Sequence, residues 1–76
     1  MRELIERGLR ACREEDTVTV ADVFLELTAA LDFAYDGAAR RLSTLYRGNV
    51  QAARRGKFAP ARATLRLLRE HGTLRR

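Results

Sequence analysis

The 76-residue sequence has few of the residues that disulfides, metal centres and catalytic sites require. A single cysteine, Cys12, and a single histidine, His71, exclude an internal disulfide and predict no zinc site. There is no glycine-rich phosphate loop, and the acids stand singly on predicted helix faces, so no acid–base pair can be named. We therefore expect no enzymatic activity, no cofactor, no metal and no small-molecule substrate.

The chain also lacks an apolar run long enough to span a membrane. Its first seven residues carry acids where a signal peptide would begin its apolar stretch, so we expect a cytoplasmic protein, associated with the nucleoid if it binds DNA. The length predicts one small domain over residues 1–76 with one modest core.

Carboxylates are nearly missing from the second half of the chain. Residues 1–36 hold four arginines against nine acids, a net charge of −5, whereas residues 37–76 hold eleven cations against Glu70 alone, a net charge of +10. This segregation predicts a polarised field, with the cations on one exposed flank that a polyanion would stabilise. Arginine outnumbers lysine fourteen to one, and its planar guanidinium suits bidentate contacts to phosphate and guanine.

Apolar periodicity predicts four helices. We expect them over residues 2–14, from an N-cap at Thr19 to about residue 31, over 35–47, and over 61–71. Residues 17–19 are β-branched and predict a small strand or an extended linker. Gly8 weakens the first helix, which indicates that something packs closely against it.

A β-hairpin is predicted after the third helix, which we expect to stop at Gly48 and Asn49. Residues 50–53 and 58–60 would be its strands, and Gly56 would supply the positive φ that a tight turn at 54–57 requires. The alanine-rich segment 51–53 suits a helix equally well.

The third helix has a predicted apolar stripe of small residues and leucines. The stripe consists of Ala34, Ala38, Leu42 and Leu45, which turns Gly37, Arg40, Ser43, Thr44 and Arg47 outward. Small residues beside long cations allow a helix backbone to approach a polyanion closely.

The order of these elements resembles the winged helix-turn-helix domain of transcription regulators over about residues 3–60. Residues 17–23 are similar to the start of the family's positioning helix, residues 34–45 to its recognition helix, and residues 54–58 to its wing tip. The resemblance implies a mainly α fold with a small β-hairpin, in which a three-helix core carries a wing and a C-terminal helix.

The same resemblance implies a double-stranded DNA partner and a role as a small transcriptional regulator. Helix 35–47 would enter the major groove, and the basic wing at 54–57 would contact the minor groove or the backbone. The implied DNA-binding residues are Tyr35, Gly37, Ala39, Arg40, Arg41, Ser43, Thr44, Arg47, Arg54, Arg55 and Lys57. Leu67 and Leu74, which the predicted core leaves over, suggest a homodimer through the first and last helices.

A second resemblance is to the flagellin export chaperone, an all-helical bundle. It covers residues 4–32 and 37–71, and its clearest segments are 26–32, 45–46 and 65–70. It implies helix and loop over residues 49–59, and a function of masking an apolar partner helix in a groove. A continuous helix through residues 50–53 would favour this alternative. A third possibility is an interaction module whose basic face binds an acidic protein or RNA.

Overall fold

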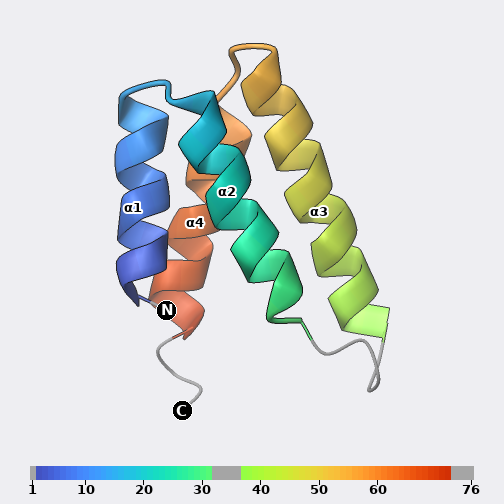
Figure 1. Ribbon diagram of the computed structural model, residues 1–76. Helices are drawn as coiled ribbons and strands as arrows, with labels where there is room; N and C mark the ends of the chain where they lie inside the picture. Colours follow the sequence, from blue (N-terminus) through green and yellow to red (C-terminus); the bar gives the residue numbers. More distant parts are fainter. Residues whose placement is uncertain (1, 32–36, 73–76) are drawn as a thin grey trace.

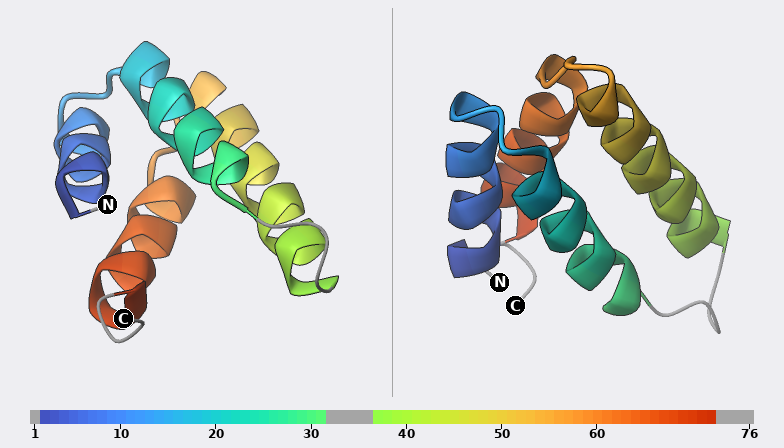
Figure 2. Two further views of the ribbon diagram at one scale, coloured as in Figure 1. Left: turned by 60° about the horizontal axis from the view of Figure 1, so that its bottom comes forward. Right: turned by 45° about the horizontal axis from the view of Figure 1, so that its top comes forward.

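The computed structural model describes residues 2–31 and 37–72, which form four helices and, over those residues, no strand (Figure 1). The helices are α1 (Arg2–Arg13), α2 (Thr17–Ala29), α3 (Gly37–Arg54) and α4 (Ala59–Gly72). They alternate in direction along the chain (Figure 1). The helices α1 and α3 each pack against α2 and α4, and α2 and α3 lie side by side in all the views (Figure 2).

The structure corrects the predicted winged helix-turn-helix fold, because the wing is absent from the described part of the chain. Residues 50–54 continue α3, residues 55–58 turn, and α4 begins at Ala59, where the hairpin and its basic tip at 54–57 were expected. The predicted stop fails at Asn49, whose buried side chain donates a hydrogen bond to Thr64 Oγ1 at 2.7 Å. Packing against α4 therefore overrides the tendency of asparagine to end a helix.

The predicted strand or linker at 17–19 is also wrong, because α2 begins before Thr19. The N-cap is Asp16, whose carboxylate accepts hydrogen bonds from the Thr19 amide at 3.2 Å and the Thr19 hydroxyl at 2.7 Å. This cap satisfies a free amide at the helix start, so β-branched residues can form the first turn of α2.

The helices α1 and α3 end in turns of the same kind. After α1, the Asp16 amide donates to the Ala11 carbonyl at 2.8 Å, and Glu15 adopts a left-handed φ of 55°. After α3, Gly56 occupies the equivalent position with a φ of 84°. These are the features of a Schellman motif. The predicted positive φ at Gly56 is confirmed, although the turn joins two helices and not two strands.

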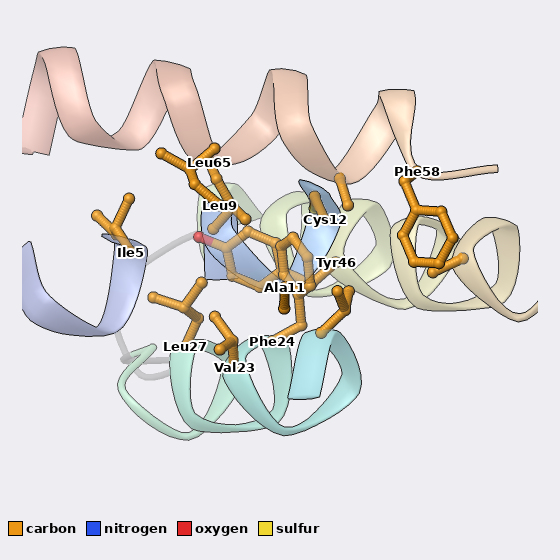
Figure 3. Close-up of a cluster of buried hydrophobic side chains, with 13 residues drawn as sticks. Ile5, Leu9, Ala11, Cys12, Val23, Phe24, Leu27, Tyr46, Phe58 and Leu65 are labelled. Atoms are coloured by element: carbon orange, nitrogen blue, oxygen red, sulfur yellow. The ribbon is translucent and has the colours of Figure 1, made fainter. Parts of the chain in front are cut away.

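All four helices contribute to one hydrophobic core (Figure 3). The rings of Phe24 and Tyr46 lie 5.4 Å apart at an angle of 45°, which joins α2 to α3. A Cβ at Gly8 would lie 2.8 Å from Leu65 Cδ1 and 3.0 Å from Val23 Cγ1. The absence of a side chain at Gly8 therefore lets α1 approach α2 and α4 closely, as the sequence predicts.

The buried side of α3 differs from the predicted stripe. Its buried members are Ala39, Tyr46, Asn49 and Ala53, and its half-buried members are Leu42, Ser43, Val50 and Ala52. Leu45 is 45% exposed, and Ala34 and the side chain of Ala38 lie outside the described residues. The predicted stripe was set by the spacing of alanines and leucines, whereas the large ring of Tyr46, packed on Phe24, fixes the observed rotation of α3.

Candidate functional site

A groove with a volume of about 490 Å³ lies between α2 and α3. We call it the α2–α3 groove. It is lined by Ala21, Asp22, Phe24, Leu25 and Thr28 of α2 and by Ser43, Tyr46, Arg47, Val50, Gln51 and Arg54 of α3. Phe24 and Tyr46 are buried and Val50 is half-buried, so they form an apolar floor, while Leu25 on the α2 side is 70% exposed.

The helix α2 has large apolar side chains on its outer side as well as on its inner side. Among its 13 residues only Asp22 and Glu26 are charged. The inner side buries Val20, Val23, Phe24 and Leu27. Val18 and Leu25, seven residues apart on one line of the outer side, are 72% and 70% exposed. Asp22 and Glu26 are exposed on the same side, so the outer side of α2 combines two large exposed apolar side chains with two carboxylates.

The two walls of the groove carry opposite charges. Arg47 and Arg54 stand on the α3 wall, seven residues or about 10.5 Å apart along the axis. Asp22 stands on the α2 wall. All three are exposed, and none belongs to an ion pair with another described residue. The groove therefore combines an apolar floor with unpaired charge on both sides.

A second, smaller hollow of about 380 Å³ lies between α1 and α2 and shares Asp22 and Leu25 with the groove. Here Arg7 Nη2 lies 3.1 Å from Glu26 Oε2. The second carboxylate of α2 is therefore already engaged in an ion pair. Both partners are exposed, so this pair adds little stability. With Glu26 paired, Asp22 is the carboxylate on the outer side of α2 that forms no ion pair with another described residue.

Most, but not all, of the residues predicted to bind DNA are exposed. Gly37, Arg40, Arg41, Thr44, Arg47, Arg54, Arg55 and Lys57 are exposed, Ser43 is half-buried in the groove, Ala39 is buried, and Tyr35 lies outside the described residues. Among the cations of α4, Arg69 lies 3.5 Å from Glu6 of α1. This cation therefore lies on the α1 side of α4 and not with the cations of α3.

The groove offers contact surfaces and no reactive groups. Burial raises the pKa of the Tyr46 phenol, so the ring remains neutral in the floor. Away from the groove, burial also raises the pKa of the Cys12 thiol, which the charge of Arg62 partly offsets. No three side chains of His, Cys, Asp or Glu gather within residues 2–31 and 37–72 in a way that could hold a metal ion.

The sequence analysis missed the α2 wall of the groove. The DNA-binding interpretation included Ser43, Arg47 and Arg54, and it gave Asp22 and Leu25 no binding role. The available signal was Leu25, which extends the apolar side of α2 beyond the stripe that faces the core.

Comparison of the chain with protein-family models, with curated proteins and with solved structures finds no match, so the function is argued from the geometry of the chain itself. Within the described residues, no helix combines the length and the apolarity needed to cross a bilayer.

Proposed function

We propose that the protein binds an amphipathic helix of a partner protein in the α2–α3 groove. The observation that carries the proposal is the exposed side chain of Leu25, which lines the groove beside a floor of aromatic and aliphatic side chains. Val18, also exposed, lies two turns away on the same line of α2. Helix-in-groove recognition inserts anchors at positions i, i+3, i+4 and i+7 into such a floor. Support also comes from the unbroken course of α3 through residues 50–53, which builds the second wall.

The exposed apolar side chains limit the affinity to be expected. Burial of Val18 and Leu25 contributes about 1.5–3 kcal/mol each. Association costs about 4–15 kcal/mol of translational and rotational freedom, so the contacts of the groove floor must add to these two anchors, and together they exceed that cost only modestly. We therefore expect dissociation constants of about 1–100 μM for an isolated helical peptide, or about −8 to −5 kcal/mol.

Fluorescence anisotropy with a designed peptide tests this proposal. The probe is a fluorescein-labelled amphipathic helix of about 18 residues, about 27 Å long, with a leucine stripe and mixed Glu and Lys flanks. Replacement Leu25→Ser removes an anchor without adding charge, and we expect it to weaken binding about tenfold or more. The matched control is Leu67→Ser, which changes a leucine of α4 that is 56% exposed and outside the groove.

Two outcomes would reject the groove as the binding site. Equal weakening by Leu25→Ser and Leu67→Ser would show that any exposed leucine suffices, and equal binding of a scrambled peptide would show that helical amphipathicity is not recognised. Analytical ultracentrifugation of the free protein tests whether the chain forms a dimer through the groove. A dimer that Leu25→Ser dissociates would mean that a second copy of the chain covers the groove.

A second candidate function is duplex DNA binding through backbone phosphates, which would place the protein at the nucleoid. The observation that favours it is a carboxylate-free segment from residue 37 to residue 69. On α3 and the turn after it, the exposed cations are Arg40, Arg41, Arg47, Arg54, Arg55 and Lys57. None of the six forms an ion pair with another described residue, so all can contact phosphates.

The two candidates can be separated because Arg40, Arg55 and Lys57 do not line the groove. If DNA is the partner, replacement of all three by alanine weakens duplex binding. It also makes the negative slope of log affinity against log salt less steep by about three, about one for each lost phosphate contact. The same variant leaves peptide binding unchanged. Unaltered DNA binding by this variant would reject the second candidate.

A further inference from the structure

The opposite charges on the walls of the α2–α3 groove stand at nearly the same level along it. The Thr17 hydroxyl donates a hydrogen bond to the Ala53 carbonyl at 3.4 Å, so the start of α2 lies beside the end of α3. The helices are antiparallel and rise equally per residue, so Asp22, five residues after Thr17, lies level with about Gly48. Asp22 is therefore nearly opposite Arg47, with the groove between them.

Both charges are available to a bound molecule. Asp22 and Arg47 are exposed, and no ion pair joins either of them to another described residue. The neighbouring Glu26 is already 3.1 Å from Arg7, so Asp22 is the carboxylate of α2 that a partner can use. Arg54 extends the positive wall by two helical turns, about 10.5 Å.

We propose that the groove accepts its partner helix in one direction only, with acidic residues of that helix along α3 and a basic residue against Asp22. This inference rests on the proposed function. When a helix is turned end for end with its apolar stripe still on the groove floor, its two flanks exchange places. A helix with acids on one flank and cations on the other thus meets opposite charges in one direction and like charges in the reverse direction.

The spacing of the two arginines specifies the partner further. Acidic residues separated by seven positions repeat on the same flank of a helix, as Arg47 and Arg54 do on α3. We therefore expect the natural partner to carry two carboxylates seven residues apart on one flank and a lysine or arginine on the other.

Two designed peptides with mirrored flanks test the direction of binding. Both have the same leucine stripe and composition, but one has glutamates at the e positions and lysines at the g positions of each heptad, and the other has the reverse. Each carries a nitroxide at its amino end and is added to ¹⁵N-labelled protein. We expect one peptide to broaden amide signals near Thr28 and Ser43 at least about twofold more than those near Thr17 and Arg54, and the other peptide to do the opposite.

A charge-exchanged variant serves as the matched control. Asp22→Lys combined with Arg47→Glu and Arg54→Glu reverses both walls, and because all three side chains are exposed the fold should persist, which circular dichroism checks. We expect the two broadening patterns to exchange between the peptides in this variant.

The outcomes distinguish a failure of the directional inference from a failure of the proposed function. If both peptides bind but broaden the same end, or each broadens both ends equally, the directional inference is overturned while the groove remains the binding site. If neither peptide binds the wild-type protein, the proposed function and the inference both fail.

Discussion

At the scale of single residues, Gly8 determines how closely α1 approaches its neighbours. Replacement Gly8→Ala gains about 1 kcal/mol of helix propensity, but the added methyl group overlaps Leu65 and crowds Val23. Both of these side chains are fully buried in a closely packed core. We predict a net loss of about 1–3 kcal/mol in the free energy of unfolding, measured by urea denaturation.

The matched control is Gly48→Ala on the exposed side of α3, where a Cβ meets nothing within 4 Å. We expect this replacement to stabilise the protein by about 0.5–1 kcal/mol, since only the helix propensity changes. An equal gain from both replacements would contradict the close packing described at Gly8.

The carboxylate of Asp16, which caps α2, makes the free energy of unfolding depend on pH. Hydrogen bonds from the Thr19 hydroxyl and the Thr19 amide hold the pKa of this carboxyl below its ordinary value. A lowered pKa in the folded state stabilises the protein above the unfolded pKa of about 3.9, and this contribution is lost as the pH falls through the lowered folded value. We predict that the free energy of unfolding falls more between about pH 5 and about pH 2 in the wild type than in Asp16→Asn, which keeps a cap but does not titrate. Urea titrations at stepped pH measure this difference, and parallel falls would contradict it.

At the scale of elements, the two helix-closing turns provide a comparison within one molecule. Glu15 and Gly56 both adopt left-handed φ, but only glycine does so without a steric cost. We predict that Glu15→Gly raises the free energy of unfolding by up to about 1 kcal/mol and that Gly56→Ala lowers it by about 1–2 kcal/mol. Thermal unfolding of both variants checks the signs, and a change of the same sign in both would contradict this account of the turns.

The helices that local signals specify were predicted well. α1 and α4 have clear apolar stripes, and Pro60 lies in the first turn of α4, close to its predicted start. The errors arose where distant contacts decide the structure. Asn49 has the local chemistry of a helix end, yet its hydrogen bond to Thr64 across the bundle holds it within α3. Gly56 has the chemistry of a tight turn, which serves a helix–helix connection as well as a hairpin.

At the scale of the whole molecule, the sequence predicts the amounts of charge and apolar surface but not their juxtaposition. The excess of cations after residue 36 is evident in the sequence, whereas the position of Arg69 on the α1 side of α4 depends on packing, as its contact with Glu6 shows. The groove likewise depends on α2 and α3 lying antiparallel, which brings Leu25 and Asp22 opposite Arg47.

The most direct test of the groove is a ¹⁵N–¹H correlation titration of the full chain with the mixed-flank amphipathic peptide. We predict chemical-shift changes concentrated in residues 21–28 of α2 and 43–54 of α3, with α4 around Leu67 unaffected. Changes centred on α4, or changes spread evenly over all four helices, would contradict the assignment of the α2–α3 groove as the binding site.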